Sequence, residues 1–270
     1  MKKNLILIIA VILAGCETNP PTQPLSLKTG EVKVAISVKE DNTINPDRII
    51  LLEDFANVSC IPCVTSNKII RSVLNNYGSD KIVSVKFPTN FPSPVDPFYL
   101  AGKSFCDFRI SYYNILFAPT IILDGTMRPT PTDSVALKES INERLAVTSN
   151  MSIAVTKTSV NGGLLFNIDI AIKDKSIQDL DELFLKCALV ESEIEFEQPP
   201  GANGETKFYD VLRLLLPSNE GFVLSSLDGS HTYQFDNSLD SLWNINKIEA
   251  VVFIQKADTK EVYQTGSTFK

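Results

Sequence analysis

The pattern of apolar and polar positions changes character near residue 150. Before that point, short apolar runs typical of strands alternate with stretches in which apolar residues recur at helical spacing. Strands are predicted at 49–55, 82–87 and 120–123, and helices at about 62–77, 98–113 and 134–146. Elements that alternate in this order predict an α/β sheet with helices packed on it.

After residue 150, almost every stretch has the character of a strand. Asn161-Gly162 separates 151–160 from 164–172, where apolar residues alternate with polar or small ones, so a two-stranded hairpin is predicted. Further strands are predicted at 184–190, 209–216, 231–235, 248–255 and 262–269. About seven short antiparallel strands predict an all-β, immunoglobulin-like sandwich.

The chain begins with a short apolar stretch typical of an export signal. Lys2 and Lys3 precede apolar residues from 5 to 14, and Gly15 and Cys16 follow. A run of this length is too short to cross a bilayer as a helix. The residues Leu13-Ala14-Gly15-Cys16 resemble the bacterial lipoprotein box. That resemblance implies a signal peptide at 1–15 and a lipidated Cys16; the alternatives are an uncleaved anchor and an ordinary secretory signal.

Residues 16–30 combine three prolines with polar residues, so we predict an extended or flexible tether there. Lipid on Cys16 would hold the protein on a membrane while its body stays in water. The rest of the chain is divided into an α/β domain at 31–150 and the β-sandwich domain at 151–270.

Composition and charge exclude several classes of protein. Of 270 residues 44% are hydrophobic, which suffices for one large domain or two ordinary ones. With 25 basic against 32 acidic residues and no long Lys/Arg run, the chain lacks the positive charge needed to bind nucleic acid or anionic lipid headgroups. The single histidine, His231, is expected to be structural, and no cofactor is predicted.

Four cysteines follow Cys16, and only Cys60 and Cys63 are close in sequence. They lie where the strand at 49–55 ends and the helix at 62–77 begins. The partial positive charge of a helix N-terminus stabilises a thiolate and lowers the pKa of the first cysteine. Pro62 suits the first turn, where its missing N–H is not needed. The pattern predicts thiol–disulfide exchange, in which an exposed Cys60 attacks and Cys63 resolves the mixed disulfide.

Two other roles for this pair compete with exchange. A zinc site needs about four ligands, and the only other candidates are Cys106, Cys187 and His231, so no metal site is predicted. A permanent structural disulfide stays open because an exported protein permits one, although so small a ring stabilises little. An oxidising compartment also favours pairing of Cys106 with Cys187 over free buried thiols.

Two passages resemble the thioredoxin fold. They are Leu52-Glu53-Asp54-Phe55-Ala56-Asn57-Val58-Ser59-Cys60-Ile61-Pro62-Cys63 and Phe117-Ala118-Pro119-Thr120-Ile121-Ile122-Leu123-Asp124-Gly125. The resemblance implies that Ala118-Pro119 is a cis bond facing the disulfide. Pro119 would then shape a substrate groove that also includes Ile61, Pro62 and Ala118.

The same resemblance implies that Asp54 is the buried acid that moves protons to and from Cys63. Glu53, on the other face of the strand, is expected at the surface or an edge. Ser59 stands where the family has an aromatic residue, and Ile61-Pro62 stands in place of its Gly-Pro, so the reduction potential stays open. The aromatic-rich stretch 88–116 is expected to contribute to the core rather than to a ligand cage.

The mature chain also resembles the 28-kDa outer-membrane protein family of exported bacterial lipoproteins. Three passages carry this resemblance: Leu52-Glu53-Asp54-Phe55, Phe208-Tyr209-Asp210-Val211-Leu212-Arg213, and Ala250-Val251-Val252-Phe253-Ile254-Gln255 with Lys260-Glu261-Val262-Tyr263-Gln264. It implies a thioredoxin-like N-terminal domain, a C-terminal β-sandwich and anchoring in the cell envelope, at the outer membrane. Asp210 stands where the family has a histidine. Arg213 is expected to pair with a carboxylate rather than to bind an anion.

Two functions are therefore open. The first is thiol–disulfide exchange on thiols or disulfides of exported proteins, together with an unidentified reducing partner. The second is a non-catalytic binding or structural lipoprotein whose disulfide only stabilises the fold. An exposed Cys60 of low pKa would favour the first, and a buried one the second.

Overall fold

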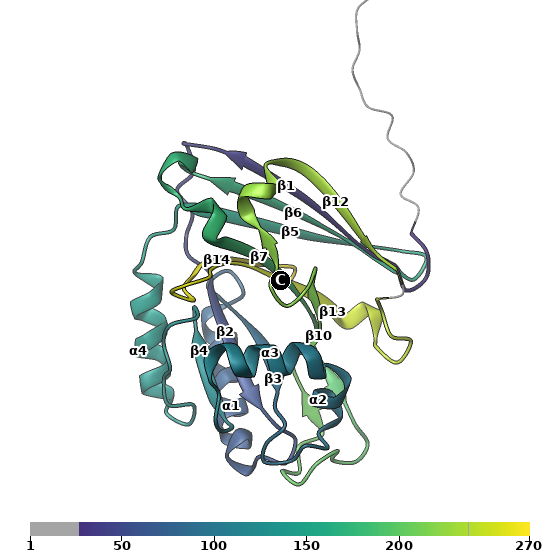
Figure 1. Ribbon diagram of the computed structural model, residues 1–270. Helices are drawn as coiled ribbons and strands as arrows, with labels where there is room; N and C mark the ends of the chain where they lie inside the picture. The colour runs from purple at the N-terminus through teal and green to yellow at the C-terminus, as the bar shows by residue number, and fades with distance from the viewer. Residues whose placement is uncertain (1–26, 237) are drawn as a thin grey trace, which may run out of the picture.

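The structure is a computed structural model that describes residues 27–236 and 238–270 (Figure 1). The predicted signal peptide, Cys16 and most of the predicted tether lie outside the described residues. The end of that tether is packed: Leu27 is buried, and the Thr29 hydroxyl donates a 3.0 Å hydrogen bond to the carbonyl of Asn161. The prediction of a flexible tether is therefore wrong for 27–30. No helix within the described ranges is long and apolar enough to cross a membrane.

The first half of the chain has the predicted alternation of strands and helices. Its elements are β1 (Val32–Glu40), β2 (Ile50–Ala56), α1 (Ile61–Tyr77), β3 (Ile82–Pro88), α2 (Pro97–Ala101), α3 (Lys103–Tyr113), β4 (Thr120–Leu123) and α4 (Ser134–Leu145). The single helix predicted at 98–113 is divided into α2 and α3 by Gly102, which lies outside both. Glycine has a low helix propensity, which suits it to such a break.

The second half consists mainly of strands. They are β5 (Met151–Val160), β6 (Gly163–Ile172), β7 (Leu183–Glu191), β8 (Ile194–Glu195), β9 (Lys207–Phe208), β10 (Val211–Leu216), β11 (Phe222–Val223), β12 (Gly229–Phe235), β13 (Ile248–Lys256) and β14 (Val262–Ser267). The predicted hairpin of β5 and β6 is confirmed: Asn161 and Gly162 have φ of 52° and 77°, the left-handed values that such a turn requires.

One mixed sheet runs through both halves in the order β14-β13-β7-β10-β3-β2-β4, with β11 beside β7 (Figure 1). β10 is parallel to β3, β3 is parallel to β2, and β4 is antiparallel to β2. The strand that completes the α/β sheet next to β3 thus comes from the second half. The strands beyond it, β7, β13 and β14, are antiparallel.

A second sheet, β12-β1-β6-β5, packs on β7 and β13 and forms the expected sandwich. β1 pairs with β12 and β6, so 32–40 lie in the sandwich and not, as predicted, with the α/β domain at 31–150. The reason is the two-residue alternation of β1, which buries Val32, Val34 and Ile36 against the apolar face of the long sheet.

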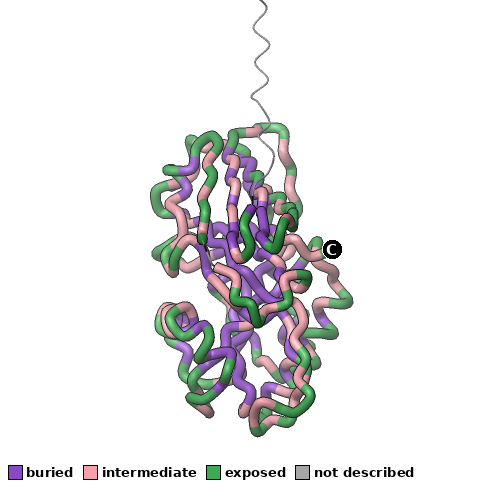
Figure 2. The backbone as a smooth tube through the Cα atoms, turned by 90° about the vertical axis from the view of Figure 1, so that its right-hand side faces the viewer, coloured by how far each residue is buried: buried purple, intermediate pink, exposed green. Residues whose placement is uncertain are grey.

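The two faces of the long sheet are covered differently. On one face, α3 covers a single core that extends across the sheet from β4 to β14. On the other face, α1 and α4 cover β2 and β4, whereas the second sheet covers β7 and β13. Figure 2 shows buried positions gathered in the interior of both halves and where they meet. The two halves therefore share a sheet and a core.

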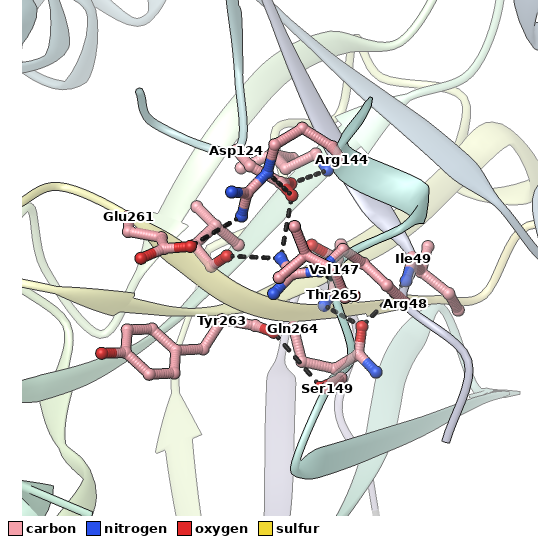
Figure 3. Close-up of polar contacts among 12 residues, drawn as sticks. Arg48, Ile49, Asp124, Arg144, Val147, Ser149, Glu261, Tyr263, Gln264 and Thr265 are labelled. Carbon is pink, nitrogen blue, oxygen red and sulfur yellow. Dashed lines mark hydrogen bonds and ion pairs between the residues drawn. The ribbon is translucent and has the colours of Figure 1, made fainter. Parts of the chain in front are cut away.

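A buried polar cluster fastens the β4 turn to α4 and β14 (Figure 3). Asp124 accepts hydrogen bonds from Arg48 Nη1 at 2.9 Å and from Arg144 Nε at 3.0 Å. Arg48 also donates to the carbonyl of Val262, at 2.9 Å. A Cβ at Gly125 would lie 1.7 Å from the carbonyl oxygen of Lys260, so only glycine fits there. These contacts fix the two halves relative to each other.

Candidate functional site

Cys60 and Cys63 form a disulfide where β2 passes into α1. Cys60 is the N-cap residue of α1, and the N–H of Cys63 donates to its carbonyl at 3.2 Å. Pro62 occupies the first turn and is exposed. The predicted placement of the pair at the positive end of a helix is confirmed, which favours a thiolate on Cys60 once the disulfide opens.

The disulfide is buried. Cys60 is 2% exposed and Cys63 is 0% exposed, so the prediction of an exposed Cys60 is wrong for the disulfide form. Ala56 of β2 and Ala118 pack against the two cysteines. A thiolate that attacks Cys60 therefore needs a small local displacement of this cover.

Two exposed apolar residues are next in sequence to residues of the disulfide cluster. The Ala118–Pro119 bond is cis, as the thioredoxin resemblance implies, and Pro119 is buried. Phe117, directly before Ala118, is 65% exposed, and Ile61, directly after Cys60, is 63% exposed. Because Ala118 packs against the cysteines, each of the two exposed side chains is next in sequence to a residue of the disulfide cluster.

The loop before the disulfide is held by buried polar side chains. Asn57 Nδ2 donates to the carbonyls of Thr89 at 2.6 Å and Ser93 at 2.9 Å. The N–H of Val58 donates to Asp96 Oδ2 at 2.8 Å, and Asp96 also caps α2. The segment after β3 thus supports the backbone that leads into Cys60, while Phe98 belongs to a small core, as expected.

The second half contributes a wall to the site that the sequence did not predict. The loop 196–206, between β8 and β9, packs on the backbone before Cys60, where the N–H of Asn203 donates to the carbonyl of Val58 at 3.1 Å. A Cβ at Gly201 would lie 2.3 Å from that same oxygen. The Pro199-Pro200-Gly201 turn was a visible signal of a loop, but nothing in the sequence indicated what it contacts.

Asp54 lies two residues before Ala56 in β2, on the face that carries the disulfide. It is 3% exposed and forms an ion pair with Lys86 of β3. Lys86 Nζ also donates to Asn67 Oδ1 at 2.7 Å, and Asn67 Nδ2 donates to Glu205 at 2.8 Å. Among the described residues, Asp54 Oδ1 has no hydrogen-bond partner, although it is buried. Asp54 lines a cavity of about 160 Å³ beside α1.

Glu53 is buried, which corrects the prediction that it lies at the surface or an edge. It is 0% exposed because α3 covers its face of β2. Arg109 Nε donates to Glu53 Oε1 at 2.9 Å, and the Tyr113 hydroxyl donates to Oε2 at 2.6 Å. Arg109 Nη1 also donates to Gln255 Oε1 at 3.0 Å. The sequence did not identify Arg109 as the partner of Glu53, because Arg109 lies in a helix fifty-six positions further along the chain.

Cys106 and Cys187 are free and buried, so of the two alternatives that the sequence left open, the unpaired one is found. Cys106 lies on α3, whereas Cys187 of β7 faces the sandwich core on the other side of the sheet. Burial raises the pKa of the Cys187 thiol to about 12 and that of Cys106 further, which makes both poor nucleophiles. Arg213 pairs with Glu191 at 2.7 Å, as expected.

In the described ranges, no three His, Cys, Asp or Glu side chains are grouped so that they could hold a metal ion.

No family model and no curated protein matches the chain. The fold is similar to that of HBP35 of Porphyromonas gingivalis, with a TM-score of 0.68 and 14% identity over 85% of this chain and 76% of that one.

It is also similar to protein AGR_C_4864 from Agrobacterium tumefaciens, with a TM-score of 0.55 and 12% identity over 82% of this chain and 94% of that one. At such identities the likeness shows the fold alone. A thioredoxin-like N-terminal region followed by a β-sandwich agrees with the HBP35 structure.

Proposed function

We propose that the protein is a thiol–disulfide oxidoreductase of the bacterial cell envelope that acts on exported proteins. One observation carries this proposal: the Cys60–Cys63 disulfide begins α1 and packs on Ala56, and two residues before Ala56, on the same face of β2, is Asp54, a buried acid that keeps an unpartnered oxygen among the described residues. A purely structural link needs neither the positive end of a helix nor a buried proton acceptor beside it.

The proposed reaction transfers two electrons from a substrate dithiol to the disulfide. A substrate thiolate attacks Cys60 Sγ, the Cys60–Cys63 bond breaks, and Cys63 leaves as a thiolate that takes a proton from Asp54. The second substrate thiolate then attacks the substrate sulfur of the mixed disulfide. The substrate disulfide forms and Cys60 leaves as a thiolate. The reverse sequence reduces a substrate disulfide.

The substrate would bind as an extended segment along the groove formed by Ile61, Pro62, Ala118 and Pro119. Exposed apolar side chains such as Ile61 and Phe117 favour an apolar stretch of polypeptide next to the substrate cysteine. We further propose anchoring at the outer membrane through lipid on Cys16, membership of the 28-kDa lipoprotein family, and a reducing partner in the envelope. The lipoprotein box and the three resembling passages support these points.

A second candidate is a binding or structural lipoprotein in which the disulfide never opens. The burial of both cysteines favours it, because a nucleophile cannot reach Cys60 without local movement.

A redox titration distinguishes the two candidates. The chain from Glu17 onward is equilibrated in glutathione or dithiothreitol buffers, and alkylation of Cys60 and Cys63 is read by mass. A reversible couple between about −120 and −270 mV, the range of known oxidoreductases, supports exchange. A disulfide with a potential below about −300 mV that opens only on unfolding would support the structural role.

A further inference from the structure

Two cavities meet at Asp210, beside the proposed redox centre. The first, of about 160 Å³, is lined by Asp54, Lys86, Ser84 and Asp210. The second, of about 420 Å³, is more polar and is also lined by Ser84 and Asp210, together with Ser192. Asp210 therefore lies between Asp54 and the wider cavity, which has room for water.

Asp210 is held firmly at this position. It has a left-handed φ of 54°, and its carbonyl accepts a 2.8 Å hydrogen bond from the N–H of Lys86. Its carboxylate accepts a hydrogen bond from the Ser84 hydroxyl, and the residue is 5% exposed. Ser84 and Lys86 are two apart on β3, so both side chains point to the face of Asp54.

Burial raises the pKa of the Asp210 carboxyl to about 6, against the lowering effects of Ser84, Arg71 and Lys86. The negative charge of Asp54 raises that pKa as well. The other charged groups that line the two cavities are Lys68, Glu193, Glu205, Lys207, Lys247 and Lys270. A group with this pKa exchanges protons readily near neutral pH.

The side of Asp54 that faces the disulfide is closed to solvent. Cys60 and Cys63 are buried, and the loop 196–206 packs on the backbone before them. Asp54 must nevertheless change its protonation state each time the disulfide opens or closes, if it serves Cys63. A proton path on the other side is therefore needed, and the two cavities supply it.

We propose that Asp210 relays protons between Asp54 and solvent. This proposal rests on the proposed oxidoreductase function and adds a residue that acts through Asp54. When the disulfide opens, Asp54, the carboxylate paired with Lys86, takes a proton from the Asp210 acid through water in the smaller cavity and gives it to Cys63 Sγ. Water in the wider cavity then protonates Asp210 again. No electrons move in this relay, and ring closure runs it in reverse.

Asp210→Asn is the variant that tests the relay. Asparagine tolerates the left-handed φ and can still accept the Ser84 hydrogen bond, so the fold should be kept. Ser84→Ala, which removes only that hydrogen bond, is a second variant. Because the bond lowers the pKa of Asp210, its loss should move the Asp210 ionisation to higher pH without abolishing it. Circular dichroism confirms that each variant is folded.

The first measurement is the ¹³C shift of the Asp54 carboxyl carbon against pH in the oxidised protein. In the wild type, ionisation of Asp210 adds a step near pH 6 to this titration. In Asp210→Asn the step near pH 6 is lost from the Asp54 shift, because the group that ionises there is gone. An Asp54 titration that is the same in both proteins would overturn the relay.

The second measurement is the rate of ring closure after the reduced protein reacts with an aromatic disulfide that has a coloured thiolate. Closure needs proton loss from Cys63, so Asp210→Asn should slow it about tenfold above pH 6, less than the roughly hundredfold of a group that takes the proton directly. Equal rates and pH profiles in both proteins would overturn the relay alone. A wild-type disulfide that cannot be reduced in the folded state would overturn the proposed function, and the relay with it.

Discussion

Glu53 and Asp54 are consecutive residues of β2 with buried carboxylates that point to opposite faces of the sheet. Both oxygens of Glu53 have partners, Arg109 and Tyr113, in a closed core. Asp54 has Lys86 on one oxygen and, among described residues, none on the other, and it lines a cavity. Burial alone thus does not mark a residue as functional. Asp54 differs from Glu53 in combining an unfilled hydrogen-bonding position with a place in the lining of a cavity.

The largest expected effect is on stability, from Glu53→Gln. This change leaves the fully buried Arg109 without its counter-charge, and breaking a buried ion pair in this way costs about 3–5 kcal/mol. Urea unfolding measures the loss. Asp54→Asn is the comparison in the same strand, and its loss should be smaller because Lys86 is partly exposed and keeps its bond to Asn67. Equal losses from the two substitutions would remove the distinction between the two carboxylates.

The second effect is on rate, from Asp54→Asn. Without an acid beside Cys63, reduction of the disulfide by dithiothreitol should slow about a hundredfold, while the folded protein stays largely intact. Stopped-flow or quenched alkylation measures the rate across neutral pH. In the folded fraction of Glu53→Gln the rate should be unchanged, and a comparable slowing there would contradict the assignment of Asp54.

The third prediction concerns Lys186, a buried amine that forms no ion pair with a carboxylate among the described residues. Lys186 donates to the main-chain carbonyls of Asn219 and Glu220 and forms no ion pair among the described residues. Burial, and next the charge of Arg109, lowers its pKa to about 7. Between pH 7 and the unfolded pKa of about 10.4, the unfolded chain binds more protons than the folded one, so stability rises with pH.

The slope from Lys186 is at most about 1.4 kcal/mol per pH unit. Unfolding by urea at a series of pH values measures it, and Lys186→Met should flatten this part of the curve. A wild-type stability that falls through this window, with no change on substitution, would show that the amine is not held in a neutral environment.

The smallest effect concerns the loop that covers the redox site. In Gly201→Ala, the new methyl group conflicts with the Val58 carbonyl, so the loop should lift away at a cost of about 1 kcal/mol and the disulfide should be reduced faster. Gly204→Ala is the control, because a Cβ there has nothing within 4 Å although its φ is 79°. Faster reduction in both variants would point to general loosening rather than to an uncovered disulfide.

Local signals predicted the parts of the site that depend on local structure. The apolar run of β2, Pro62 in the first turn and the helical spacing of α1 were enough to place Cys60 and Cys63 at a strand-to-helix junction. The Asn161-Gly162 turn likewise specified its hairpin. In each case the residues that decide the structure lie within a few positions of one another.

Features set by distant contacts were not predicted. β1 reads as an ordinary amphipathic strand, and only its pairing with β6 and β12 places it in the sandwich. Glu53 reads as a surface residue until α3 covers it, and the exposure of Cys60 depends on Ala118 and nearby packing. Asp210 is adjacent to Asp54 in space because β10 pairs with β3, a contact across more than a hundred residues.

The central claim is that the start of α1 makes Cys60 a nucleophile. The most direct test is the rate of Cys60 alkylation against pH in Cys63→Ser, in which Cys60 is a free thiol. The account predicts a thiolate pKa well below the free-cysteine value of about 8.5. A pKa at or above that value would contradict the account, because the start of α1 would then not be activating the sulfur.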